Sequence, residues 1–350
     1  MRRPAMALLI VGLVAGCSTA GSTPSATAPP APSSPIATPV TATPSPTPAV
    51  TSTPSPTPGI TAPSLAPGTA TKSPAKAAQA HIYWANRGYD LDTNPPTTMG
   101  RANIDGTGVN QRFITAGHSM FGLAILGDHL YWTDTGTNSI GRANLDGTGV
   151  NQSFISSSGF GITGDGTYLY WADPASGWIG RANLDGTEVN PSFIFAGGMP
   201  VSVAVGGNYI YWTDFSSDNR IGRASLDGTG VNPSFIDCSA SPGDTMPFAI
   251  TISGSYIYWT NYVWKVTGGG TIGRAKLDGT GANQSFLGGD LADFNPGWIA
   301  IAGGYMYWSE PGDALSPGKG TIERAKLDGT ELTRNFIAGA FTPIGLVVGP

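Results

Sequence analysis

Cysteine and histidine are scarce in this sequence: its 350 residues contain two cysteines, Cys17 and Cys238, and three histidines. With so few cysteines, no disulfide framework can hold the fold. Charged residues make up only 12% of the chain, the formal net charge is −5, and lysine and arginine form no continuous stripe. We therefore expect no nucleic-acid partner, because binding nucleic acid requires basic residues that neutralise phosphates.

The first sixteen residues have the features of an export signal. Arg2 and Arg3 give a positive start, and residues 7–13 form an apolar run that is too short for a permanent membrane helix. Residues 14–17, Val-Ala-Gly-Cys, resemble the lipobox of bacterial lipoproteins. That resemblance implies cleavage before Cys17 and lipidation of its thiol, with the product anchored at the outer side of the bacterial cytoplasmic membrane or in the cell envelope. The alternative is an ordinary signal peptide with a chance cysteine.

Residues 18–80 contain no aromatic side chain and are mostly Pro, Ser, Thr and Ala. Such a segment cannot bury apolar surface and stays extended and solvated. The predicted organisation is a signal peptide at 1–16, a lipidated cysteine with a disordered tether at 17–80, and a folded domain at 81–350. Cys238 then has no intrachain partner, and we expect it to be an inert loop residue rather than a nucleophile.

A repeat of about 45 residues dominates the folded domain. The dipeptide Tyr-Trp occurs six times at intervals of 39 to 49 residues, and each copy is followed by Gly-Arg-Ala or Glu-Arg-Ala and then by Asp-Gly-Thr. The six tyrosines are Tyr83, Tyr131, Tyr170, Tyr211, Tyr258 and Tyr307. Repeats of this length are typical of propeller blades, each a sheet of four strands. We call these strands A to D in chain order.

One repeat illustrates the expected strands, at residues 201–205, 209–214, 221–226 and 232–236. Adjacent Tyr and Trp side chains point to opposite faces of strand B, so both faces of the sheet are buried. The first repeat has no strand A before His81, whereas residues 344–348 match the strand A pattern of 121–125. The predicted fold class is therefore all-β, a six-bladed β-propeller closed by a C-terminal strand that completes the first blade.

The motifs at residues 131–134 and 211–214, both Tyr-Trp-Thr-Asp, resemble the YWTD repeats of the low-density lipoprotein receptor family. The resemblance covers residues 81–350 and all six repeats, although other copies drift, for example to Tyr-Trp-Ala-Asp, Tyr-Trp-Thr-Asn and Tyr-Trp-Ser-Glu. It implies a six-bladed propeller that serves in extracellular protein recognition. The disulfide-rich neighbouring modules of that family are absent, so its ligand-release mechanism does not transfer.

The connections between strands B and C differ in length. From the repeat Trp to the repeat Arg the separation is 10 or 11 residues in blades 2, 3 and 4, but 15 to 17 in blades 5, 6 and 1. These last three blades are consecutive in a closed ring, so their loops are expected to form one raised rim.

Trp298 replaces a small residue of strand A and is expected to project into the channel mouth. The predicted ligand-binding residues of this rim are Trp298, Trp264, Tyr262, Tyr89, Asp90, Asp92, Asp293, Phe294, Glu310 and Asp313. Drift of surface loops is the competing explanation.

The last residue of strand B follows the same division. Blades 2, 3 and 4 have Asp134, Asp173 and Asp214 there, whereas blades 1, 5 and 6 have Asn86, Asn261 and Glu310. We expect each aspartate to form a structural ion pair with the arginine of its own blade, namely Arg142, Arg181 or Arg223.

These observations favour a non-catalytic extracellular binding or scaffold protein over an enzyme. The alternative is a propeller enzyme of the streptogramin-lyase or gluconolactonase-like type, acting on a small molecule at the channel mouth. No histidine-rich metal motif or nucleophile elbow occurs, and we predict no catalytic residues and no cofactor. Calcium bound by Asp92, Asp293, Glu310 and Asp313 is a weaker possibility than hydrated surface acids. The expected partner of this monomer is an envelope or extracellular protein or glycan.

Overall fold

The computed structural model describes residues 80–86, 97–216, 218–239, 245–263, 269–289, 291, 293–311 and 320–350. These ranges contain 24 strands and no helix. A search of the same residues for helices long and apolar enough to cross a membrane finds none. The predicted signal peptide, Cys17 and the tether lie outside the described residues.

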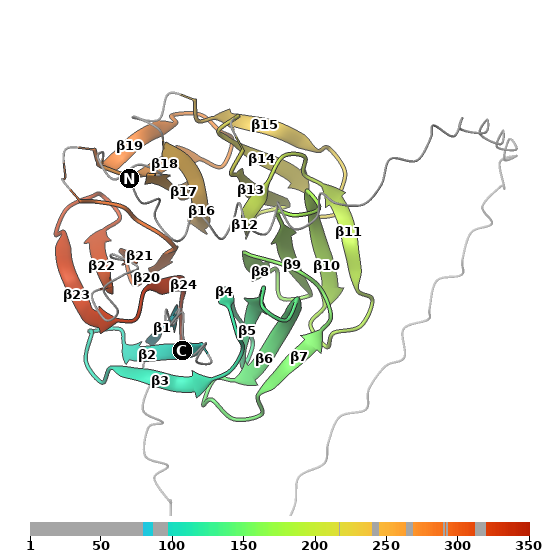
Figure 1. The fold of residues 1–350 in the computed structure, drawn as a ribbon. Helices are drawn as coiled ribbons and strands as arrows, with labels where there is room; N and C mark the ends of the chain where they lie inside the picture. Colours follow the sequence, from blue (N-terminus) through green and yellow to red (C-terminus); the bar gives the residue numbers. More distant parts are fainter. Residues whose placement is uncertain are drawn as a thin grey trace, which may run out of the picture. The chain divides into compact units, whose positions relative to one another are not determined.

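Six four-stranded antiparallel sheets form the six blades of a propeller (Figure 1), as the repeats predict. Blade 1 is β24 (Pro343–Gly349), β1 (His81–Asn86), β2 (Thr98–Asn103) and β3 (Asn110–Thr115). Blade 2 is β4 (Met120–Leu126), β5 (His129–Asp134), β6 (Ser139–Asn144) and β7 (Asn151–Ile155). Blade 3 is β8 (Ile162–Gly164), β9 (Tyr168–Asp173), β10 (Trp178–Asn183) and β11 (Asn190–Phe195). Blade 4 is β12 (Pro200–Gly206), β13 (Tyr209–Asp214), β14 (Arg220–Ser225) and β15 (Asn232–Asp237). Blade 5 is β16 (Thr245–Ser253), β17 (Tyr256–Val263), β18 (Thr271–Lys276) and β19 (Asn283–Gly288). Blade 6 is β20 (Ile299–Ala302), β21 (Tyr305–Glu310), β22 (Gly320–Lys326) and β23 (Thr333–Ala340).

The ring closes as the sequence predicts. The C-terminal strand β24 pairs antiparallel with β1, with Val347 opposite Tyr83 and Leu346 opposite Trp84. In each blade strand A is innermost and strand D outermost (Figure 1). One end of the propeller therefore carries the ends of strands B and D and the starts of strands A and C, and we call it the B–C/D–A end. The opposite end carries the A–B and C–D turns.

The repeat Tyr and Trp side chains form the packed interior, which confirms that they are core residues. All six repeat tryptophans, Trp84, Trp132, Trp171, Trp212, Trp259 and Trp308, have no exposed surface. In five blades the residue opposite the Trp on strand C is glycine, and a Cβ atom at that glycine would overlap the indole ring, as at Gly222 against Trp212. Blade 6 has Glu323 opposite Trp308, and there the indole packs on Phe294 with ring centroids 5.5 Å apart.

The threonine of the Tyr-Trp-Thr-Asp motif joins neighbouring blades. The hydroxyl of Thr213 in blade 4 accepts a hydrogen bond from the Ser202 amide of its own strand A at 3.2 Å and donates one to the Phe248 carbonyl of blade 5 at 2.7 Å. Thr260 makes the equivalent contacts between blades 5 and 6. These bonds fix the starts of the strands A at the B–C/D–A end.

Candidate functional site

The last side chain of each strand B fixes backbone at the B–C/D–A end. In blade 2 the carboxylate of Asp134 accepts hydrogen bonds from the amides of His118 at 2.8 Å, Ser119 at 3.0 Å and Gly136 at 2.8 Å. Two of these amides belong to the connection that enters from blade 1, and the third belongs to the blade's own B–C turn. Asp134 therefore acts as a structural cap that links two connections.

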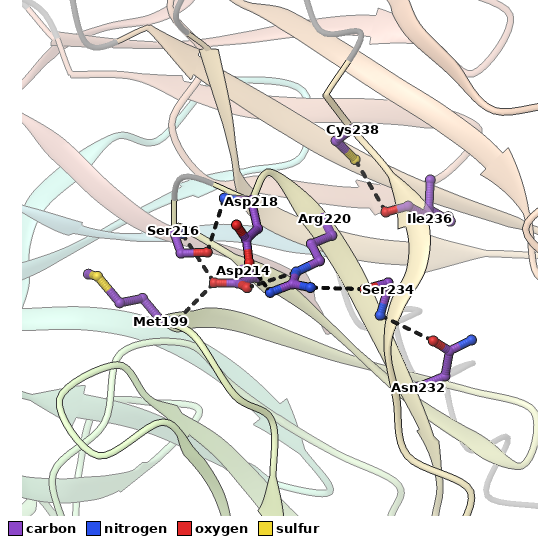
Figure 2. Close-up of polar contacts among 9 residues, drawn as sticks. All are labelled: Met199, Asp214, Ser216, Asp218, Arg220, Asn232, Ser234, Ile236 and Cys238. Carbon is purple, nitrogen blue, oxygen red and sulfur yellow. Dashed lines mark hydrogen bonds and ion pairs between the residues drawn. The ribbon is translucent and has the colours of Figure 1, made fainter.

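Blade 4 adds an ion pair to this arrangement (Figure 2). Asp214 accepts from the amides of Met199 at 2.8 Å and Ser216 at 3.1 Å, and Arg220 Nε lies 3.4 Å from its Oδ2. The Arg220 guanidinium also contacts the exposed carboxylate of Asp218. Asp214 is thus held by two amides and one cation, so the hydrogen-bonding capacity of this buried side chain is used within the fold.

The predicted pairing of the aspartates with Arg142, Arg181 and Arg223 is wrong. Each of these guanidinium groups lies over the ring of a phenylalanine on strand D, at 4.2 Å for Arg142 over Phe154 and 4.0 Å for Arg223 over Phe235. The cause is the strand register, because Arg142 lies opposite Tyr131, three positions before Asp134. The arginines therefore stabilise the outer strand by cation–π contacts.

The asparagines of blades 1 and 5 take over the same capping position. Asn86 accepts from the Trp84 indole at 2.9 Å and from the Phe341 amide at 3.1 Å, and donates to the Gln111 carbonyl at 2.8 Å. Asn261 donates to Thr271 Oγ1 and to the Gln284 carbonyl. Asparagine can donate as well as accept, so it ties strand B to strand D in these blades.

In blade 6 the capping position holds a buried carboxylate pair. Glu310 accepts from the Asn295 amide at 3.1 Å, and Glu323 pairs with Arg334 at 2.9 Å. The second oxygen of Glu323 is buried with no hydrogen-bond partner among the described residues. Burial, reinforced by the negative charge of Glu323, raises the pKa of Glu310 to about 8. Glu310 is therefore protonated at neutral pH.

This raised pKa predicts that the native state loses stability as the pH rises. Between the ordinary value of 4.5 and about 8 the folded protein binds more protons at Glu310 than the unfolded chain, so the free energy of unfolding falls through that window. We expect Glu310→Gln to remove this slope and to be more stable than the parent at pH 9, by an amount on the order of a few kcal/mol. Thermal unfolding from pH 5 to pH 9 measures the effect. Glu331→Gln, at an exposed glutamate, is the control, and parallel curves for parent and Glu310→Gln contradict the prediction.

Three predicted rim residues are buried, which corrects the expectation of exposed aromatic contacts. Phe294 has no exposed surface, Trp298 has 6% and Tyr262 has 7%. Trp298 and Tyr262 pack on Phe248 with ring centroids 5.6 and 5.5 Å away, and Phe215 of blade 4 packs on the same ring. Trp298 therefore does not project freely into the channel mouth, because it fills the junction between blades 5 and 6.

The remaining predicted rim residues divide into two groups. Asp293 is exposed, with a φ of 62°, and Glu310 is buried. Tyr89, Asp90, Asp92, Trp264 and Asp313 lie outside the described residues. Within the described part of the chain, no group of three or more His, Cys, Asp or Glu side chains could hold a metal ion. Of the four acids considered for calcium, Asp293 and Glu310 belong to the described residues and Asp92 and Asp313 do not.

Cys238 has no nucleophilic character in this fold. Its side chain is fully buried at the end of β15, and burial raises the pKa of the thiol to about 12. A thiol that stays protonated at neutral pH is unreactive.

An aromatic pair on blade 3, a half-buried tryptophan and an exposed phenylalanine, was missed from the sequence. Trp178 begins β10 and lies directly opposite Phe195, the last residue of β11, with ring centroids 5.0 Å apart. Phe195 is 58% exposed, the highest value for a large apolar side chain in the described residues. The position of Trp178 in the repeat could have revealed the pair, because the residue that begins strand C is not aromatic in any other blade.

Comparisons with known proteins support the fold. No family model and no curated protein matches the chain. Among solved structures, a nidogen/laminin complex matches with a TM-score of 0.61 at 20% identity, covering 77% of this chain and 98% of that chain. A catalytically inactive virginiamycin B lyase from Staphylococcus aureus with quinupristin matches with a TM-score of 0.50 at 19% identity, covering 76% and 92%. The selenomethionine form of that lyase gives 0.51 at 20% identity, with the same coverage. The six-bladed propeller expected from the YWTD resemblance is thereby confirmed at the level of the fold.

Proposed function

We propose that this chain is an exported, lipid-anchored binding protein that presents the B–C/D–A end of its propeller to an extracellular ligand. One observation carries the proposal. The described polar side chains that end the strands B are engaged in structural contacts, as Asp134, Asp214 and Asn86 are, while the large exposed apolar side chains at this end include Phe195 and Phe341. Exposed aromatic groups on a rigid frame favour recognition.

The fixed backbone supports the same function. Amide-capping side chains and the inter-blade bonds of Thr213 and Thr260 hold the connections in place. A surface that is already ordered loses little conformational entropy when it binds. The long B–C segments of blades 5, 6 and 1, read from the sequence, remain part of the proposed surface.

The comparisons bear on this proposal only as analogies. The nidogen structure contains a laminin partner, whereas the other two neighbours are lyases. Both activities occur on one fold, so the fold by itself does not choose between them. Binding without turnover is the function that fits the capped polar groups and the buried aromatic junction.

A capture experiment tests the proposal. The immobilised full-length chain is exposed to an envelope extract from its own source, and we expect specific retention of a protein or glycan. The control is the same chain after thermal unfolding, which removes the surface but keeps the composition. In parallel, the chain is incubated with a cyclic depsipeptide of the streptogramin class and with simple lactones. Product formation there, or no retention beyond the unfolded control, overturns the proposal.

A further inference from the structure

A row of three side chains crosses strands B, C and D of blade 3. Asp173 ends β9, Trp178 begins β10 and Phe195 ends β11, and the register sets Trp178 directly opposite both of the others. Residues directly opposite each other in an antiparallel sheet have side chains on the same face. The three side chains therefore form one row across strands B, C and D at the B–C/D–A end, which we call the blade 3 row.

The same row has different chemistry in the other blades. The residues that correspond to Trp178 and Phe195 are Thr98 and Thr115 in blade 1, Arg220 and Asp237 in blade 4, and Thr271 and Gly288 in blade 5. Small or charged residues thus satisfy the blade architecture at these positions. An aromatic pair with one ring 58% exposed is not explained by packing.

Polar groups surround the aromatic pair. Asp173 is partly exposed, unlike the buried Asp134 and Asp214 at the same position. Its oxygens accept from the Ser176 hydroxyl at 2.8 Å, from the Ala175 amide at 3.1 Å and from the Ser158 hydroxyl at 3.5 Å. A carboxylate has about four lone-pair positions, so Asp173 retains capacity for a further donor.

The backbone beneath the row is firmly held. The Gly177 amide donates to the Asp173 carbonyl at 3.0 Å, and the Ala196 amide donates to the Gly177 carbonyl at 3.0 Å. In the connection to blade 4, a Cβ atom at Gly198 would overlap the carboxylate of Asp214, so only glycine fits there. The two rings and the carboxylate are thus presented by an ordered backbone, as recognition of a small rigid ligand requires.

We propose that the blade 3 row is a glycan-binding subsite in which one pyranose ring stacks on the exposed Phe195 ring, is flanked by the Trp178 ring, which is tilted by 56° to that of Phe195, and donates a hydroxyl hydrogen bond to Asp173. The C–H groups on one face of a pyranose carry partial positive charge and are attracted to the negative face of an aromatic ring. The equatorial hydroxyls at the edge of the same sugar meet the carboxylate and the hydroxyls of Ser158 and Ser176. This subsite rests on the proposed binding function and names its ligand class.

The size of the patch favours a sugar over a protein. Among the described residues the other large exposed apolar side chains do not extend it. Val109, Val150, Val189 and Val231 lie in the C–D turns at the opposite end of the propeller, Tyr209 begins a strand B there, and Phe341 lies in the connection from blade 6 to blade 1. A stable protein interface buries about 800 Å² on each partner. Two rings and one carboxylate match a single sugar ring instead.

Affinity electrophoresis of the full-length chain in gels containing hydroxyethyl cellulose, soluble starch, laminarin, mannan or solubilised peptidoglycan tests the subsite. We expect retardation by at least one of these polymers, with at least a tenfold loss of affinity in Trp178→Ala and in Phe195→Ala. Asp173→Asn should weaken binding about threefold to tenfold, since the amide keeps one acceptor oxygen. Val189→Ala, at an exposed apolar residue in the C–D turn of the same blade at the opposite end of the propeller, should bind like the parent. Retardation by none of the polymers, or equal retardation of parent and Trp178→Ala, overturns the inference.

The two proposals fail separately. If the capture experiment retains a protein partner and Trp178→Ala retains it equally, the glycan subsite is refuted while the binding function stands. If the immobilised chain retains nothing from the envelope extract and no polymer retards the chain in the gel, both proposals are refuted. Circular dichroism of each variant excludes loss of fold as the cause, and Phe195→Ala, at an exposed edge position, provides a second variant that leaves the core untouched.

Discussion

Removal of residues 343–350, which comprise β24 and the following Pro350, is expected to abolish folding of the whole propeller. Six residues of β1 pair with this strand, and Ile344 and Leu346 are buried against the neighbouring blades. Losing about 1 kcal/mol for each of several hydrogen bonds and about 1.5–3 kcal/mol for each buried side chain removes on the order of 10 kcal/mol. That loss is comparable with the entire stability of a typical domain. Circular dichroism and size-exclusion chromatography should show an aggregated chain without a cooperative unfolding transition.

Two controls separate ring closure from a general effect of truncation. Deleting Pro350 alone, which lies beyond the strand, should lower the unfolding temperature only slightly, because its carbonyl accepts a long hydrogen bond of 3.4 Å from the Tyr83 hydroxyl. Moving residues 342–349 to the N-terminal side of His81, joined by the two-residue blade 4 turn Gly207-Asn208, should restore folding because β24 and β1 then form a local hairpin with Gly349 opposite His81. A truncated chain that unfolds cooperatively, or a rearranged chain that stays unfolded, contradicts the role assigned to β24.

Gly222→Ala is expected to cause the largest loss of stability of any single methyl addition in blade 4. The new Cβ would overlap the ring of Trp212, which has no exposed surface and is packed between two blades. Relief requires movement of the indole or of β14, and overpacking of this kind costs about 3 kcal/mol. For a domain of this size the unfolding temperature should fall by about 6–12 °C, as measured by differential scanning calorimetry.

Gly207→Ala is the matched control, at a turn of the same blade. A Cβ there meets no atom within 4 Å, and the cost is limited to the positive φ of 58°, about 1 kcal/mol. The order of the two variants is the diagnostic result. Equal unfolding temperatures for Gly222→Ala and the parent would contradict the prediction, because they would show that the Trp212 indole can move away from the new methyl group without loss of stability. Blade 6 shows how a larger residue is accommodated, since Glu323 coexists with a Trp308 that packs on Phe294.

The fold was predictable because its evidence is local and repeated. Six copies of Tyr-Trp, each followed by Arg-Ala and Asp-Gly-Thr, define the strands and turns, and the strand A pattern of residues 344–348 identifies the closing strand. Alternation along a strand also shows correctly that both faces of each sheet are buried. None of these conclusions requires knowing which residues of different strands face each other.

The site was predicted much less well. The sequence correctly indicates a structural role for the aspartates that end the strands B. Their partners, however, are backbone amides and, for Asp214, Arg220, rather than the repeat arginines. The aromatic residues Trp298, Tyr262 and Phe294 look in sequence like exposed loop residues, yet Phe248 and Trp308 cover them. Trp178 and Phe195 are seventeen positions apart and carry no shared motif, so nothing in the sequence joins them.

The sequence by itself therefore determined the number of blades, the order of their strands and the closure of the ring, since these follow from hydrophobic periodicity and turn chemistry. Only the tertiary structure decided which side chains meet. Antiparallel register moves Arg142 three positions away from Asp134, and the packing of blade 6 against blade 5 buries Trp298. The same register brings Trp178 and Phe195 together at an exposed edge. Contacts between strands and between blades depend on a register and a packing arrangement that no single strand contains.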